Sequence, residues 1–208
     1  MRISKKLIIM TVCAVFAAVI LSILLAVMRN RAEAQKKLQF AEDGLLAEIR
    51  SSPLWDGGQG AWVFYDTVYQ VYNDGKQMYF AENFQDGYTV DLPPVVSQLS
   101  KEEVLAIQKA IEDNKFMELG GMSNPAVCDG SSVYVTVYTA GQSHTSGGNN
   151  PFNVEGIERF DAVCAAIHGS YTEEELTYRR QVDQILKKQY EGADACINGE
   201  AGISGSYQ

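Results

Sequence analysis

The feature that most constrains this 208-residue chain is an uncharged apolar stretch near its N-terminus. It runs from Leu7 to Met28 as LIIMTVCAVFAAVILSILLAVM, in which only Thr11 and Ser22 are clearly polar. At a rise of about 1.5 Å per residue, a helix of this length covers roughly 33 Å, enough to cross a hydrocarbon core of about 30 Å. We therefore predict a transmembrane anchor over residues 7–28, preceded by a short cytoplasmic tail over residues 1–6.

A cleaved secretory signal is the alternative, because Ala32-Glu33-Ala34 offers small residues for a cut before Gln35. The apolar core of a signal is usually about 7–15 residues long, which is shorter than this stretch, and Arg29 and Arg31 fit poorly just before a cleavage site. The anchor is therefore favoured, and secretion after cleavage near Ala34 stays open.

The direction of insertion follows from the ends of the chain, because basic residues flank the stretch on both sides and nearly balance. A short tail with Arg2, Lys5, Lys6 and the amino terminus is hard to move across a membrane. We expect a single-pass cell-membrane protein with its C-terminal domain outside.

The charge is divided unevenly along the chain. Residues 1–37 hold seven of the 17 Lys and Arg residues, and the rest of the chain carries 10 basic and 25 acidic side chains. Such a surface repels phosphate backbones, so nucleic acid is not expected as a partner.

The expected elements give an α+β fold. Residues 29–52 keep a helical spacing of apolar residues and predict a stalk helix, and residues 192–208 are rich in Gly, Ala and Ser and predict a disordered tail. Between them, residues 53–191 form the extracytoplasmic domain. Five strands are expected, at residues 62–72, 77–81, 88–92, 132–139 and 142–146. They predict a mostly antiparallel sheet with helices packed on one face.

Three helices are expected in this domain. Ser100 and Glu103 form a capping box before one helix, and Thr172 and Glu175 form a second box before the last. Between these two helices, Asn153 is the expected N-cap of a helix that buries a stripe of apolar residues: Ile157, Phe160, Cys164 and Ile167.

The four cysteines lie at positions 13, 128, 164 and 196, without a C-x-x-C pair. Cys13 belongs to the apolar stretch, so the remaining three cannot all pair with one another. Cys128 and Cys164 form either a disulfide or two buried thiols, and the sequence leaves both open.

No motif for catalysis survives inspection, since G-x-S-x-G and S-x-x-K are both missing from the chain. Its two histidines are His144 and His168. Cys164 and His168 share a helix face, but a zinc site would need Cys128 and His144 as well, and their spacing matches no ligand motif. We expect structural imidazoles and core thiols, and no metal or cofactor.

Aromatic residues gather in the first three expected strands, and such residues supply binding surfaces with a polar group. Packing in the core is the alternative for most of them. The candidate binding residues are Trp62, Tyr65, Tyr69, Tyr72, Tyr79 and Tyr88.

One part of the chain resembles a known family. It carries LSKEEVLAIQKAIEDNKF, then the strand DGSSVYVTVY, the loop SHTSGGNNP and the helix FDAVCAAI. Over about residues 99–167 it resembles small bacterial envelope proteins, mostly Gram-positive lipoproteins or membrane-anchored proteins, that have no assigned activity. The chain departs from them by lacking a lipid-attachment cysteine, and the resemblance brings no functional residues.

These observations together predict a non-enzymatic binding or interaction module whose ligand is a protein, peptide or glycan. The alternatives are an envelope enzyme and a sensory or regulatory ectodomain. An enzyme is expected to show a cleft where His144 meets an acid or a thiol, and a binding module is expected to expose the aromatic residues of the first strands.

Overall fold

The computed structural model describes residues 19–23, 38–58, 61–126, 131–151 and 153–200, and the chain divides into two units, Met1–Leu38 and Gln39–Gln208. In the first unit, residues 19–23 are helical, and the apolar side chains of Val19, Ile20, Leu21 and Ile23 are each more than half exposed. Within the described residues no helix is both long and apolar enough to cross a membrane. Most of the predicted anchor over residues 7–28 lies outside those residues.

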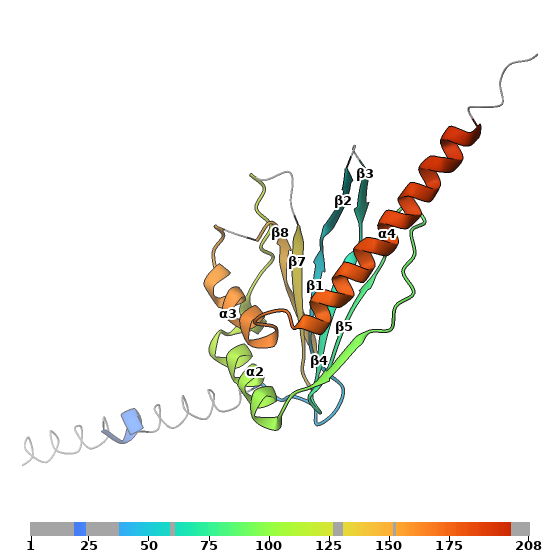
Figure 1. The fold of residues 1–208 in the computed structure, drawn as a ribbon. Helices are drawn as coiled ribbons and strands as arrows, with labels where there is room; N and C mark the ends of the chain where they lie inside the picture. Colours follow the sequence, from blue (N-terminus) through green and yellow to red (C-terminus); the bar gives the residue numbers. More distant parts are fainter. Residues whose placement is uncertain (1–18, 24–37, 59–60, 127–130, 152, 201–208) are drawn as a thin grey trace, which may run out of the picture. The chain divides into compact units, whose positions relative to one another are not determined.

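The second unit is an α+β domain, as the sequence predicts, built on antiparallel strands (Figure 1). Its strands are β1 (Leu45–Ser52), β2 (Leu54–Gly58), β3 (Ala61–Phe64), β4 (Asp66–Tyr72), β5 (Lys76–Glu82), β6 (Val95–Gln98), β7 (Ser132–Tyr138) and β8 (Ser143–Asn149). Its helices are α2 (Lys101–Asp113), the short 3-10 helix η1 (Phe116–Glu118), α3 (Ile157–Ile167) and α4 (Glu173–Glu200).

The main sheet has six strands in the order β6-β5-β4-β1-β7-β8, one more than predicted. Strand β1 lies within the stalk helix predicted over residues 29–52, which is wrong from residue 38 onward, because residues 38–44 are not helical and residues 45–52 form β1. Its apolar residues fit a helical spacing, but β1 pairs with β4 on one side and β7 on the other. Pairing on both edges satisfies the backbone of this segment and buries Leu46 and Ala47 completely.

A long hairpin that the sequence did not predict runs through β1 and β2, past Pro53, and returns through β3 and β4. The register that pairs Ser51 with Thr67 in β1 and β4 is unchanged where Leu54 pairs with Phe64 in β2 and β3. Proline has no N–H to donate, so the hydrogen-bond ladder is interrupted at Pro53. Strands β2 and β3 therefore form a two-stranded sheet beyond the main sheet.

The strand predicted at residues 88–92 is also wrong. That segment has no regular structure, and the strand that pairs with β5 is β6, after Pro93-Pro94. In contrast, β7 and β8 form the second hairpin where it was predicted.

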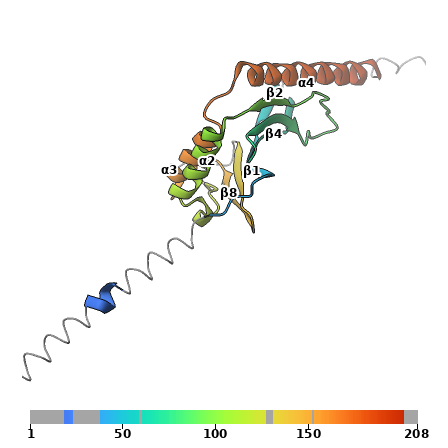
Figure 2. The ribbon, with the colours of Figure 1, turned by 90° about the horizontal axis from the view of Figure 1, so that it is seen from below.

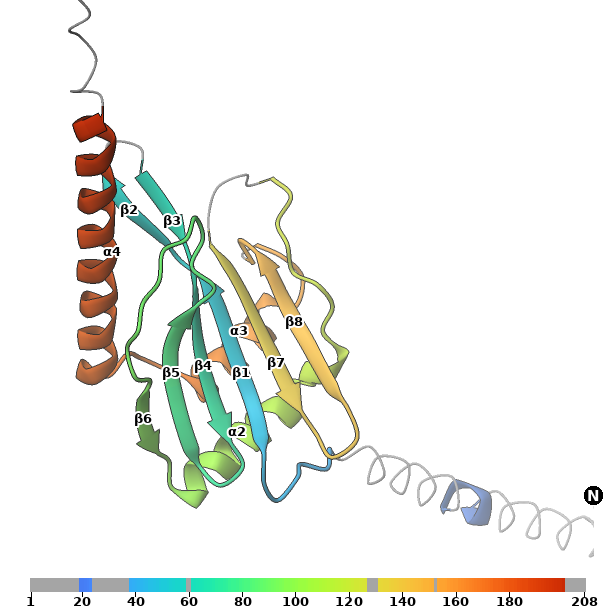
Figure 3. The same ribbon diagram turned by 90° about the vertical axis from the view of Figure 1, so that its right-hand side faces the viewer.

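The two faces of the sheet differ. Residues that pair across strands share a face, so Ile49 lies between Tyr69 and Val135, and Glu48 lies between Gln70 and Thr136. The face of Ile49 is covered by the helices, and Figure 3 shows the other face toward the viewer, with α2 and α3 behind the strands. The predicted packing of helices on one face is therefore confirmed for α2 and α3.

The core fills the space between the covered face and the helices. It holds Val135 and Val137 from the sheet and, from the helices, Val104, Ile107, Ile111, Phe160, Val163, Ile167, Tyr178, Val182 and Leu186. Figure 2 shows α2 and α3 close together at one end of the domain, while α4 runs over β2 and β4. The turn between α3 and α4 thus lies between two helical groups that share one sheet face.

The helix boundaries follow local chemistry in most places. Both sides of the capping box at Ser100 and Glu103 form at the start of α2. The N-cap of α3 is Gly156 in the left-handed conformation rather than Asn153. Helix α4 continues to Glu200, so the tail predicted as disordered from residue 192 is helical over its described part.

A candidate ligand pocket between α3 and α4

A cavity of about 350 Å³ opens where the α3–α4 turn meets the covered face of the sheet. Its walls come from the sheet, from α2, and from the end of α3 and the start of α4. The lining residues are Tyr69, Gln77, Leu99, Glu103, Ala106, Ile107, Ala166, Ile167, His168, Gly169, Ser170, Thr172 and Glu175. This volume is within the range of small-molecule sites, about 300–1,000 Å³.

The second capping box places the acid of this pocket. The Thr172 hydroxyl accepts a hydrogen bond from the Glu175 backbone N–H at 3.2 Å, and the Glu175 Oε2 atom accepts one from the Thr172 N–H at 2.8 Å. Because the side chain folds back onto the turn, it points away from solvent. Glu175 is only 4% exposed, whereas its neighbour Glu174 is exposed.

His168 meets this acid from the other side of the turn. It follows the last residue of α3 with an extended backbone, and its Nε2 atom lies 3.2 Å from Glu175 Oε2. Its ring lies 4.1 Å from the Tyr69 ring and 4.8 Å from the Tyr171 ring, centroid to centroid. An imidazole held by one carboxylate and two aromatic rings has a fixed orientation.

The sheet contributes a second polar group to the floor of the pocket. Burial raises the pKa of Tyr69 well above its ordinary value, so the phenol stays protonated. Gln77 is also buried, and its Oε1 atom accepts a hydrogen bond of 2.7 Å from the Ser97 hydroxyl. Tyr69 and Gln77 therefore act as neutral hydrogen-bonding groups.

The charge of the pocket is negative. Hydrogen bonds from the Ser100 backbone N–H and hydroxyl lower the pKa of the exposed Glu103, so this carboxyl at the rim is ionised at neutral pH. Glu175 Oε2 is shared by the Thr172 N–H and the Nε2 atom of His168. The pocket thus presents two carboxylates and one imidazole, a combination suited to a ligand that donates hydrogen bonds and carries positive charge.

The aromatic residues predicted as one binding surface are dispersed. Tyr65, Tyr69 and Tyr79 are buried against the helices, as the core alternative predicts. Trp62 is 51% exposed, and Tyr72 and Tyr88 are half-buried. Of the six, Tyr69 alone lines the pocket.

His144 has a structural position. Its Nε2 atom lies 2.7 Å from the Leu119 carbonyl oxygen, and its ring meets Phe116 edge-on. The cleft expected of an enzyme at His144 is therefore not found there. A histidine does meet an acid at His168, and its partner Glu175 was not predicted from the sequence. A capping box just after a helix-ending histidine was the available sign.

The predicted cysteine pair is only partly described, because Cys128 lies outside the described residues and the disulfide stays a prediction. Burial raises the pKa of the Cys164 thiol to about 12, so a free thiol there is almost fully protonated at neutral pH. No group of three or more metal-ligating side chains gathers within the described part of the chain.

The open sheet face carries a polar network centred on Arg50. Its guanidinium lies 2.6 Å from Glu82, 3.1 Å from Asp66 and 3.4 Å from Glu48. Because three acids surround this one cation, the guanidinium is not available to an anionic ligand, and the network holds more acidic than basic side chains.

No protein-family model matches the chain, and a search of curated proteins finds no relative. The resemblance of residues 99–167 to small bacterial envelope proteins stays a prediction.

Proposed function

We propose that this protein is a membrane-anchored extracytoplasmic binding module whose α+β domain takes a small organic cation, such as an amine or a guanidine, in the pocket of His168 and Glu175. The observation that carries the proposal is an almost fully buried carboxylate at the wall of a cavity of about 350 Å³. A carboxylate in such a place attracts a cation more strongly than an exposed one, because less water screens the charge.

The rest of the lining supports the same ligand class. The neutral polar groups of Tyr69 and Gln77 line the same cavity and can hydrogen-bond such a ligand. Ile107, Ile167 and Leu99 provide apolar contact for a short carbon chain. A ligand anion would face both Glu103 and Glu175 and is disfavoured.

An acid–base enzyme is the second candidate, favoured by the orientation of His168. A carboxylate that holds one ring nitrogen leaves the other to exchange a proton, which is the arrangement of a general base. The enzyme is supported if the protein converts a bound amine into a product and if His168→Gln still binds the amine but no longer converts it.

The pocket is tested by thermal shift and calorimetry on the full chain in detergent, with panels of small amines, guanidines, polyols and carboxylates. We expect a member of the first two panels to raise the melting temperature, since a ligand at about 100 times its Kd stabilises by about 2.7 kcal/mol.

Two neighbouring variants provide a matched comparison. Glu175→Gln keeps an oxygen for the Thr172 N–H but removes the charge, and we expect it to weaken binding by about 10- to 150-fold, the worth of a hydrogen bond between charged groups. Glu174→Gln removes the same charge from the exposed side of the same turn and should leave the Kd unchanged. Equal losses in both variants, or binding by carboxylates alone, would refute the pocket.

The anchor and its direction are tested separately by protease shaving of intact cells. Removal of the domain with survival of a fragment containing residues 7–28 supports the proposed topology. Release of the whole domain into the medium supports cleavage near Ala34, and protection of the domain contradicts an outside location.

A further inference from the structure

A second, separate feature lies at the far edge of the sheet. Strand β6 is the last strand in the sheet order, and within the described residues no strand pairs with its outer side. The Leu99 N–H donates to the Gly75 carbonyl at 2.8 Å, which fixes the alternation of the ladder with β5. The backbone groups of Val95 and Ser97 therefore point toward β5, and those of Val96 and Gln98 point outward.

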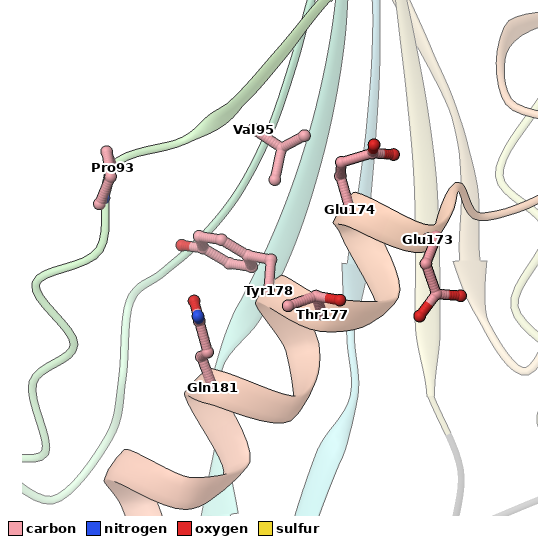
Figure 4. Close-up of a pocket in the computed structure, with 7 residues that line it drawn as sticks. All are labelled: Pro93, Val95, Glu173, Glu174, Thr177, Tyr178 and Gln181. Carbon is pink, nitrogen blue, oxygen red and sulfur yellow. The ribbon is translucent and has the colours of Figure 1, made fainter.

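A groove runs beside this edge. It has a volume of about 350 Å³ and lies between the start of β6 and the first turns of α4 (Figure 4). Pro93 and Val95 form one wall, and the other wall consists of α4 residues Glu173, Glu174, Thr177, Tyr178 and Gln181. A strand added outside β6 would direct every second side chain into this groove.

The groove is acidic on its helical wall. Both Glu173 and Glu174 are exposed; Glu173 pairs with Arg180 at 2.6 Å, whereas Glu174 has no ion-pair partner among the described residues. The charged side chains available to a docked segment are therefore the carboxylate of Glu174 and that of Glu173, which is shared with Arg180.

We propose that β6 and α4 form a docking site for an extended basic segment of a partner protein, which binds by adding a strand to the edge of the sheet. The outward N–H and C=O groups of Val96 and Gln98 pair with its backbone, as in other complexes formed by strand addition. The acidic wall selects Lys or Arg at alternate positions. This site is independent of the His168 pocket, on the opposite side of the α4 N-terminal turn.

The test uses fluorescence polarisation with the full chain in detergent and two labelled probe peptides, one alternating Lys with Val and one alternating Glu with Val. We expect the Lys peptide to bind, with an affinity that falls as salt rises, and the Glu peptide not to bind.

Two variants of one residue separate the backbone from the side chain. Val96→Pro removes an outward N–H without taking a hydrogen bond from β5, and proline is tolerated on edge strands. Val96→Ala removes most of the same exposed side chain and keeps the N–H. We expect a loss of at least about tenfold for Val96→Pro and less than about twofold for Val96→Ala.

The role of charge in peptide binding is tested with the Glu174 and Glu175 variants described above, whose expected effects are now exchanged. Glu174→Gln should weaken the Lys peptide several-fold while Glu175→Gln leaves it unchanged, the opposite of their effects on the small cation. Equal binding by Val96→Pro and wild type, equal binding of both peptides, or a dimer that Val96→Pro dissociates would each overturn the proposal, the last in favour of a second copy of this chain.

Discussion

Replacing Tyr79 by Phe should stabilise the domain, which is an unusual expectation for a core substitution. Tyr79 is 2% exposed, and its hydroxyl is the one buried side-chain oxygen or nitrogen among the described residues without a hydrogen-bond partner. Its ring meets Tyr171 and Tyr178 edge-on, at centroid distances of 5.8 and 5.7 Å. Phenylalanine keeps both ring contacts and removes only the hydroxyl.

The magnitude follows from the burial of that hydroxyl. An unsatisfied buried polar group costs about 1–3 kcal/mol, so Tyr79→Phe should raise the free energy of unfolding by about 1–2 kcal/mol. For a domain of this size, each kcal/mol shifts the melting temperature by about 2–4 °C. Urea denaturation and calorimetry measure both quantities.

Tyr178 gives the matched control, because its hydroxyl accepts a hydrogen bond of 3.1 Å from the Ala81 N–H. Tyr178→Phe removes the same atom but leaves that donor unpaired, and should destabilise by about 1 kcal/mol. If Tyr79→Phe destabilises as much as Tyr178→Phe, the Tyr79 hydroxyl has a partner in solution and the reasoning is refuted.

Three further predictions concern other parts of the domain. Gly147→Ala should destabilise by at least about 2 kcal/mol in urea titrations, because φ is +119° and a Cβ would lie 2.1 Å from the Val133 carbonyl oxygen, whereas Gly141→Ala, with open space around it, should change little. At pH 8, native Cys164 should react with iodoacetamide far more slowly than the unfolded chain, since partial burial raises its pKa to about 12; equal rates would contradict a protonated, half-buried thiol. Burial raises the pKa of Asp66, but hydrogen bonds to its carboxylate outweigh this effect and leave the pKa below its ordinary value. Its contribution to stability is therefore present above about pH 4 and is lost as the pH falls through the folded pKa. Asp66→Asn should accordingly flatten the acid side of a plot of unfolding free energy against pH.

The sequence predicts local features of this fold well. The capping boxes at Ser100 and Thr172 form as expected because the residues that make them are three apart and need no distant partner. The hairpin of β7 and β8 is predicted for the same reason, since alternation and a short turn specify it locally.

Features that depend on distant residues are missed. Leu45, Leu46 and Ile49 suit a helix by spacing, and only the strands on both sides make β1 a strand. The pocket is missed from the sequence for a related reason. His168 and Glu175 meet across a helix break, and Tyr69 comes from a strand about 100 residues earlier in the chain. The sequence predicts that the acids at the start of the last helix are caps. Glu175 is a cap, but its Oε2 atom also contacts the Nε2 atom of His168.

The position of β1 also determines when the domain can fold. This strand leads the sheet in sequence but lies in its interior, and the neighbour on one side, β7, begins only at Ser132. Contacts of such long sequence separation close late, so a chain still being synthesised holds β1 with a bare edge until more than 80 further residues have followed. Nascent chains that stop before residue 132 should therefore aggregate or recruit chaperones, whereas chains released after residue 149 can complete both sides of the strand.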